Sequence, residues 1–289
     1  MNVDFLISIV IALIMFGIGT SISFEKFKTQ LLHPKAVFTG LMLQIIFLPS
    51  ITLLISSFTN LSTELKMGIF IVSICPGGAT SNFISYILKA DVALSVILTV
   101  FNSFLILITI PFLLNFGLNF YCLSSVENDL NLTNSIFKLL LMLITPVFTG
   151  VIVNHKKSQL CKKLSYSTKI ITTCLLAIVF GIKFFGNSKI GGSEINYNEI
   201  IVLIGPCLTI HLASLVISYL ISINMKIKKL KSITISIEVG LQNTALALLV
   251  SSVLMSNNEM SKPALVFAMF SFFTTLIFTF FVKNLNRTF

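Results

Sequence analysis

The sequence predicts an all-α membrane protein whose chain crosses the bilayer repeatedly, which is a polytopic fold. Hydrophobic residues make up 55% of the chain and charged residues only 10%, far below the roughly 25% charged residues of soluble domains. The mean hydropathy is +0.99, and the apolar residues gather into runs of about 20, the length of a membrane-spanning helix. The net charge of +10 would indicate nucleic acid in a soluble chain, but this composition argues against a nucleic-acid partner.

Nine apolar segments are expected to form transmembrane helices. The first has no basic residue before it and no small-residue cleavage site after it, so we expect a retained helix and not a removed signal peptide. The third and the eighth also contain helix-breaking residues, whereas the rest are defined by apolar length alone. In order, the predicted segments are 3–22, 36–57, 67–89, 92–119, 135–153, 168–186, 199–222, 232–255 and 263–282.

The lysines predict how the segments are oriented. The chain has 20 Lys and Arg residues, and most of them fall in alternate loops, which by the positive-inside rule face the cytoplasm. This places the N-terminus outside and the C-terminus inside, as an odd number of segments requires. The residues assigned to the inner side are Lys26, Lys28, Lys35, Lys89, Lys156, Lys157, Lys162, Lys163, Lys169, Lys226, Lys228, Lys229, Lys231, Lys283 and Arg287. Those assigned to the outer side are Lys66, Lys189 and Lys262, with Lys138 and Lys183 inside segments or at their outer ends.

Two segments are predicted to break near their middle. The third contains Cys75-Pro76-Gly77-Gly78, in which the proline removes a backbone donor and the glycines permit a non-helical path. The eighth contains the run 238–243. Because the two segments are five apart, they should run in opposite directions, which predicts inverted repeats of approximately 1–120 and 135–289, the first lacking a leading helix. Paired broken helices indicate a transporter site near the bilayer midplane.

Glu238 is the residue that most strongly indicates a site. At ~1.5 Å per helical residue it lies about 10 Å from Lys231, where an unpaired charge costs about 2.5–3.5 kcal/mol or more. Hard cations such as sodium bind oxygen ligands, and thiolates and imidazoles are missing here, which argues against zinc or copper. The alternative is that the breaks only bend helices and the polar side chains only join them. The other oxygen-bearing side chains of the two breaks are Ser81, Asn82, Gln242 and Asn243.

These motifs resemble the bile acid:sodium symporter family. The resemblance rests on Cys75-Pro-Gly-Gly-Ala-Thr-Ser-Asn82, on the stretch from Tyr86 to Thr99 and on Glu238-Val-Gly-Leu-Gln-Asn243, and it extends to Met15-Phe-Gly-Ile-Gly19 and Pro34-Lys-Ala-Val37. It implies one transporter unit, 1–289, in which two crossing broken helices belong to a core domain packed beside a panel domain. The implied core helices lie in approximately 36–119 and 199–282, and the panel helices in approximately 3–22 and 135–186.

The resemblance also implies two sodium sites that share Glu238. One would use Ser81, Asn82, Ser95, Thr99 and Glu238. The other would use Gln44, Glu238 and Gln242 with the main-chain carbonyls of Val239 and Leu241. Ser95 and Thr99 are four residues apart, so the spacing alone places them on one helical face. Substrate would lie near the crossing, against Gly78, Ala79, Thr80 and Asn243.

We therefore expect a sodium-coupled symporter that imports a small organic anion, pantoate- or keto-acid-like or bile-acid-like, by alternating access. The alternative is a proton-coupled organic anion transporter or exchanger with Glu238 as the carrier carboxyl. An enzyme is not expected, because no nucleophile–base pair or metal cluster has usable spacing. The expected partners are the anion, two sodium ions and the lipid bilayer of the cell (inner) membrane, without an obligate protein partner.

The remaining polar residues are expected to be structural. His211 is interpreted as a packed, hydrogen-bonded histidine and not as a ligand. The five cysteines show no metal or redox spacing, so we expect free, buried thiols; they are Cys75, Cys122, Cys161, Cys174 and Cys207.

Overall fold

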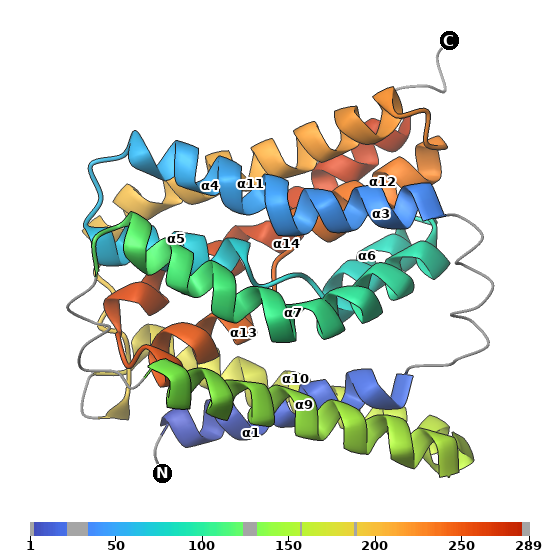
Figure 1. Cartoon of the computed structure of the whole chain (residues 1–289), viewed down its shortest axis with the longest axis horizontal. Coiled ribbons are helices and arrows are strands. Elements are labelled where there is room, and N and C mark those ends of the chain that lie inside the picture. Colours follow the sequence, from blue (N-terminus) through green and yellow to red (C-terminus); the bar gives the residue numbers. More distant parts are fainter. Residues whose placement is uncertain (1–2, 22–33, 124–131, 157, 188–189, 285–289) are drawn as a thin grey trace.

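The computed structural model describes residues 3–21, 34–123, 132–156, 158–187 and 190–284, and within them the regular structure is helical. Each of the nine predicted segments forms helix (Figure 1). The elements are α1 (Val3–Ser21), α3 (Pro34–Met42), η1 (Leu43–Phe47), α4 (Leu48–Ser57), α5 (Thr63–Ser73), α6 (Ala79–Ile87), α7 (Val92–Phe120), α9 (Leu132–Lys156), α10 (Ser158–Phe185), α11 (Tyr197–Asn224), α12 (Lys229–Gly240), α13 (Thr244–Leu248), η3 (Leu249–Leu254), η4 (Glu259–Ser261) and α14 (Lys262–Asn284). The predicted loop residues Lys26, Lys28, Lys157, Lys189 and Arg287 lie outside the described residues.

Several helices are long and apolar enough to cross a membrane. Within the described ranges, three stretches meet this test alone, namely Pro34–Ser57, Tyr197–Asn224 and Glu259–Asn284. α7 is a fourth if its two halves, which meet at a 62° bend around position 107, count as one span. Pro111 explains the bend, since its ring crowds the carbonyl four residues earlier. The protein is therefore an integral membrane protein, while the number nine stays a prediction.

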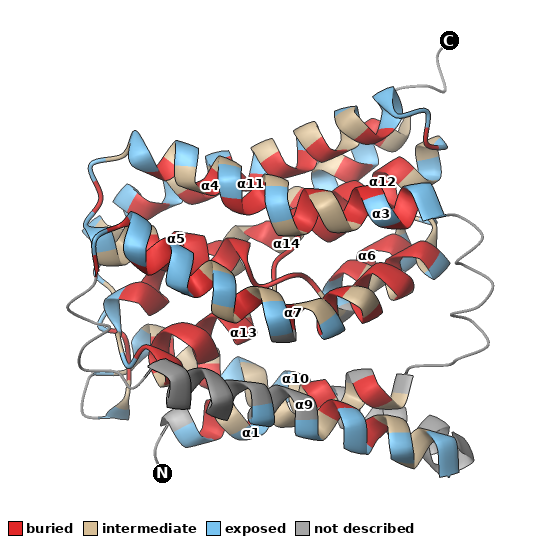
Figure 2. Cartoon of the chain, in the orientation of Figure 1, coloured by how far each residue is buried: buried red, intermediate tan, exposed pale blue. Residues whose placement is uncertain are grey.

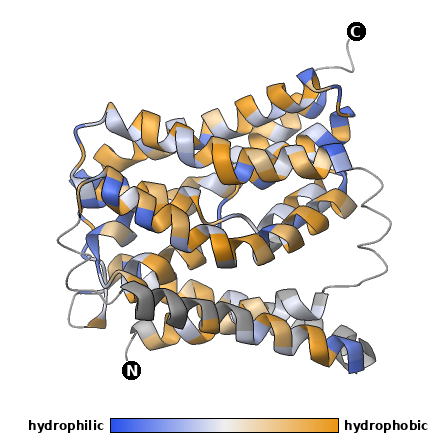
Figure 3. Ribbon diagram, viewed as in Figure 1, coloured by the Kyte–Doolittle hydropathy of each residue, from blue (hydrophilic) through white to orange (hydrophobic). Residues whose placement is uncertain are grey.

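The outer surface of the helices is strongly apolar. Along α7, Phe104, Ile108, Phe112 and Phe116 recur every four residues and are all exposed. Figure 2 shows similar exposed positions along the other long helices, and Figure 3 shows that many of them are hydrophobic. An exposed apolar surface of this extent is typical of membrane contact. The faces turned inward hold the polar residues described below.

Three helices lie together on one side of the molecule. α1 contacts both α9 and α10, and this group sits below α7 in Figure 1. A side chain at Gly19 would collide with the Val147 carbonyl of α9, and one at Gly150 would collide with the Phe16 carbonyl of α1. Small residues thus let the two backbones approach closely. These helices are the ones predicted for a panel, although their assignment as a separate domain stays a proposal.

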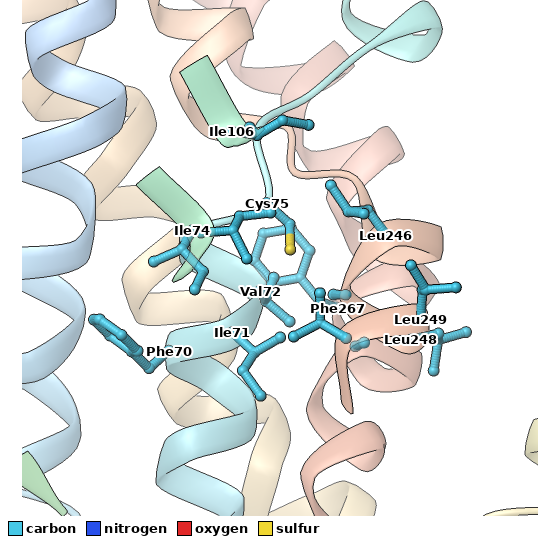
Figure 4. Packing of buried hydrophobic residues seen from close by; sticks show 14 of the residues in the cluster. Phe70, Ile71, Val72, Ile74, Cys75, Ile106, Leu246, Leu248, Leu249 and Phe267 are labelled. Carbon is cyan, nitrogen blue, oxygen red and sulfur yellow. The ribbon is translucent and has the colours of Figure 1, made fainter. Parts of the chain in front are cut away.

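A buried apolar cluster fixes the first broken segment. Figure 4 shows Val72 and Cys75, at the end of α5 and beyond it, on the side of Phe267 of α14 and Leu246 of α13, whereas Phe70 lies on the opposite side of α5. Because this packing surrounds the last turn of α5, it determines where the chain leaves the helix and enters the break.

The prediction that the cysteines are buried is correct for two of them and wrong for two. Cys75 and Cys207 are buried, whereas Cys122 and Cys174 are exposed. Cys122 follows the last turn of α7, and Cys174 lies at an exposed position of α10, because an apolar segment has an outward face as well as a packed one. The side chain of Cys161 lies outside the described part of the chain.

Candidate functional site

The two breaks lie against each other. α5 ends at Ser73 and α6 begins at Ala79, while α12 ends at Gly240 and α13 begins at Thr244. The Asn243 N–H donates to the Cys75 carbonyl at 2.9 Å. Pro76 and Gln242 also form an isolated antiparallel β-bridge. The two broken segments therefore cross in opposite local directions, at the places where the sequence predicts the breaks.

The two glycines of the first break have different surroundings. A Cβ atom at Gly77 would collide with the Leu241 carbonyl oxygen and would lie 3.5 Å from that of Glu238. A Cβ atom at Gly78 would meet no atom within 4 Å. Gly77 thus permits the close approach of the two main chains, whereas Gly78 borders open space.

Glu238 is buried beside the crossing, with 1% of its surface exposed. Its Oε1 accepts a hydrogen bond from the Thr99 hydroxyl at 2.9 Å, and its Oε2 accepts one from Ser95 at 3.3 Å. The buried Ser81 hydroxyl instead donates to the Gly78 carbonyl at 2.7 Å. The Thr99 hydroxyl lies 3.4 Å from Asn82 Oδ1. Two predicted ligands of the first sodium site, Ser95 and Thr99, therefore contact Glu238, and Asn82 contacts Thr99. Glu238 belongs to none of the ion pairs among the described residues.

The register of α7 against α12 brings these groups together. Asp91 caps α7 by accepting from the Leu94 N–H at 3.0 Å, and its own N–H donates to the Thr234 hydroxyl at 2.9 Å. One helical turn further along both helices, Ser95 reaches Glu238. The two helices therefore run parallel, as predicted for segments that both begin at the lysine-rich side.

Gln44 and Gln242 form a second polar group. Their side-chain amides pair, with Nε2-to-Oε1 distances of 3.1 and 3.4 Å. Gln242 also donates to the Val239 carbonyl at 2.7 Å, and Gln44 donates to the Ser73 carbonyl at 3.3 Å. Among the described residues, no hydrogen bond joins this pair to the Glu238 carboxyl, so the sharing of Glu238 between two sites stays a proposal.

A local irregularity places Gln44. It belongs to η1, which is a π-helical turn inside a continuous helix. Pro49 lacks the N–H that the Ile45 carbonyl would accept from in an α-helix, which favours the wider turn. Such turns are frequent at functional sites.

His211 of α11 contacts the last residue of α12 and the side chain of Thr274 on α14. One ring nitrogen lies 3.1 Å from the Gly240 carbonyl and the other 2.7 Å from the Thr274 hydroxyl. Phe267 and Phe270 pack edge-on or tilted against the ring. The interpretation of His211 as a packed, hydrogen-bonded residue is therefore confirmed.

The predicted substrate residues lie where two helices begin. Gly78 is the N-cap of α6, followed by Ala79 and Thr80 in its first turn. Asn243 is the N-cap of α13, and its side chain accepts from the Leu246 N–H at 3.0 Å. Thr80 is exposed, and Gly78 and Asn243 are half-buried. The positive ends of both helix dipoles thus lie at the crossing.

The chemistry of the crossing suits a hard monovalent cation. Within the described ranges, no three His, Cys, Asp or Glu side chains group together as a metal site. The groups present are hydroxyl, amide and carbonyl oxygens with a single carboxylate, which sodium accepts and softer metals do not prefer.

Sequence reasoning missed three polar residues, Asp91, Thr234 and Asn102. Asp91 and Thr234 set the register of α7 on α12, although the position of Asp91 just before a helix is a recognisable N-cap signal. Asn102 is buried three residues after Thr99, and that spacing could have placed it on the same face.

Comparison with known families decides the assignment. Residues 8–190 match the family described as "Sodium Bile acid symporter family". The chain belongs to the sodium bile acid symporter family. The expected resemblance is thereby confirmed at the level of the family.

Three relatives of this sodium bile acid symporter family member are named as transporters or cotransporters. The protein named "Probable sodium/metabolite cotransporter BASS1, chloroplastic" from Oryza sativa subsp. japonica is 29% identical over 256 residues, which are 89% of this chain and 60% of the relative. The ileal sodium/bile acid cotransporter of Mus musculus is 28% identical over 183 residues, 62% of this chain and 51% of the relative. A protein of Bacillus subtilis (strain 168) named as an uncharacterized sodium-dependent transporter is 24% identical over 242 residues, 83% of this chain and 71% of the relative. The chain thus spans 60% of the length of the rice relative.

Proposed function

We propose that this protein is a sodium-coupled symporter that imports a small organic anion by alternating access. The observation that carries the proposal is Glu238, a buried carboxyl that receives two hydroxyl hydrogen bonds and belongs to no ion pair among the described residues. A cation is the partner that such a group requires at membrane depth. The family and the names of its relatives support sodium as that cation.

Two sodium positions are proposed. The first is bounded by the hydroxyls of Ser81, Ser95 and Thr99, with Asn82 and Glu238. For the second, the amide groups of Gln44 and Gln242 now donate to carbonyls of Ser73 and Val239 and to each other. A sodium ion would take over the role of these N–H donors, with Glu238 and the carbonyls of Val239 and Leu241 as further ligands.

The cargo is proposed to bind beside the ions. The N-termini of α6 and α13 offer positive partial charge to an anion, and no atom lies within 4 Å of the position that a Cβ atom would take at Gly78. Gly78, Ala79, Thr80 and Asn243 are its proposed contacts. A pantoate- or keto-acid-like molecule or a bile-acid-like molecule would fit this class.

The coupling supplies ample energy without ATP. Two sodium ions entering with one monoanion carry one net positive charge inward, which gains about 2.3 kcal/mol per 100 mV of inside-negative potential. Each tenfold sodium gradient adds about 1.4 kcal/mol per ion. We also propose that the protein lies in the cell (inner) membrane, with its N-terminus outside.

A proton-coupled carrier is the second candidate. The Ser95 and Thr99 hydroxyls can donate to a carboxylate or accept from a carboxylic acid, so the same contacts would serve a protonated Glu238. This candidate makes less use of Gln44 and Gln242, whose amides make no hydrogen bond to the carboxyl among the described contacts.

Thermal stability of the purified protein tests the proposal. Sodium chloride is raised while potassium chloride holds ionic strength constant, for the wild type, Glu238→Gln and the control Glu64→Gln on α5. An ion that binds only the folded state stabilises it by RT ln(1 + [L]/Kd), about 2.7 kcal/mol at 100 Kd. We expect a sodium-specific rise in Tm for the wild type and the control that is lost in Glu238→Gln.

Reconstituted vesicles then test coupling. Radiolabelled pantoate, pyruvate and taurocholate are offered under an inward sodium gradient or an inward proton gradient. Uptake driven by sodium supports the symporter. A wild type without a sodium response, together with uptake driven by protons alone, would overturn sodium coupling in favour of the proton carrier.

A further inference from the structure

Asn102 is the polar side chain that the proposed function does not explain. It lies in the middle of α7 with 1% of its surface exposed. Neither its Nδ2 nor its Oδ1 has a hydrogen-bond partner among the described residues. Buried amides are nearly always satisfied by protein or by a bound species, so this group calls for a ligand.

The position of Asn102 continues the face that meets Glu238. Ser95, Thr99 and Asn102 follow at intervals of four and three residues, which places them on one side of the helix. Asn102 is one turn further from the lysine-rich end of α7 than Thr99. In the proposed topology, it therefore lies on the outer side of the ion site.

Asn102 lines a small cavity beside the crossing. The cavity has a volume of about 10 Å³ and lies between α7, η1 and the first break, with Gln44, Pro76 and Thr109 in its wall. This space holds roughly one water-sized particle. An organic anion is too large for it, whereas a sodium ion is not.

The polar groups around the cavity favour a cation. Asn102, Gln44 and Thr109 can each present an oxygen, and no charged side chain is in the wall. Neutral oxygens alone bind sodium weakly, as a position along an ion path requires. Thr109 and Leu113 are only half-buried, so this wall reaches the surface of the helix bundle.

We propose that Asn102 is a ligand of a transient sodium position on the outer approach to the Gln44–Gln242 pair. The inference rests on the proposed sodium coupling and adds a third position to it. An ion entering from outside would exchange part of its water shell for the Asn102 oxygen. It would then pass to Gln44, which lines the same cavity.

The test compares three substitutions on α7 in the full chain. Asn102→Leu removes the amide at similar size, Asn102→Asp places a charged oxygen at the same position, and Asn115→Leu is the control at an exposed asparagine. The readout is the sodium concentration that gives half-maximal stabilisation and half-maximal uptake, with potassium as the replacement ion. The Tm in potassium alone reports separately on folding.

The expected results are opposite shifts for the two Asn102 variants. Asn102→Leu should raise the half-maximal sodium concentration for uptake about tenfold, the usual scale for a lost ligand or supporting group. Asn102→Asp should lower it, and this second variant decides the matter if Asn102→Leu does not fold. Asn115→Leu should match the wild type.

Two other outcomes overturn the inference in distinguishable ways. If the wild type responds to sodium and neither Asn102 variant shifts the response, Asn102 binds only a structural water and sodium coupling survives. If the wild type shows no sodium response at all, the proposed function fails and this position fails with it.

Discussion

At the scale of single residues, Thr99 does most to hold the Glu238 carboxyl. Its hydroxyl makes the shorter of the two hydrogen bonds to the carboxyl and also approaches Asn82. Removal of such a donor leaves a buried acceptor unsatisfied, which lowers the stability of the folded protein by about 1–3 kcal/mol. Ser103, one turn along α7, instead donates to the Thr99 carbonyl of its own helix at 2.7 Å.

We predict that Thr99→Val weakens sodium binding because it keeps the side-chain shape and removes the hydroxyl. The half-maximal sodium concentration for thermal stabilisation should rise about tenfold, as on the loss of other metal-site groups. Ser103→Ala is the matched control and should leave that concentration unchanged. Equal sodium responses in Thr99→Val and the wild type would remove Thr99 from the site.

The residue-level site could be predicted where local spacing governs it. Ser95 and Thr99 share a helical face by their four-residue interval, and both reach Glu238. The Gln44–Gln242 contact spans 198 residues, and no spacing rule relates such distant side chains. Only the family resemblance pointed to Gln44.

At the scale of elements, the crossing depends on how closely the two breaks approach. Gly77 packs against the Leu241 and Glu238 carbonyls, whereas Gly78 has no neighbour at the position of a Cβ atom. Neither glycine has a positive φ. The steric contact, and not a left-handed backbone, therefore explains why Gly77 tolerates no side chain.

We predict opposite outcomes for alanine at the two glycines. Gly77→Ala should lower stability by about 1–3 kcal/mol, the usual cost of overpacking, and should weaken sodium stabilisation, because the carbonyls of α12 must move. Gly78→Ala should unfold at nearly the wild-type temperature. Thermal unfolding in potassium and in sodium measures both effects, and equal losses for the two variants would contradict the steric explanation.

Proline and glycine revealed the first break in the sequence, because both act on the backbone locally. The π-helical turn at Gln44 was not predicted, since a run of apolar residues reads as helix whether or not one turn is widened. Pro49 is the local signal for it, but a proline inside an apolar segment can also simply bend the helix.

At the scale of the whole molecule, the orientation in the membrane is the prediction that most needs a test. Cys122 is exposed just beyond the end of α7, on the side predicted to be outside. Lys226 is exposed in the lysine-rich turn before α12, on the side predicted to face the cytoplasm.

We predict that a membrane-impermeant maleimide labels Cys122 in intact cells, in a variant whose other four cysteines are replaced by serine. A cysteine introduced by Lys226→Cys in the Cys122→Ser background should be labelled only after the membrane is permeabilised. The physical reason is the cost of moving lysine-rich loops outward across the membrane. The reverse pattern would invert the topology.

The crossing of the two breaks also bears on how such proteins diverge. The Asn243 N–H and the Cys75 carbonyl that join them are peptide groups, which nearly every residue carries. Substitution of a side chain leaves this join in place unless proline removes the donor. Descendants of one ancestor can therefore exchange the side chains that face the cargo, and so acquire new cargoes, while inheriting the same scaffold.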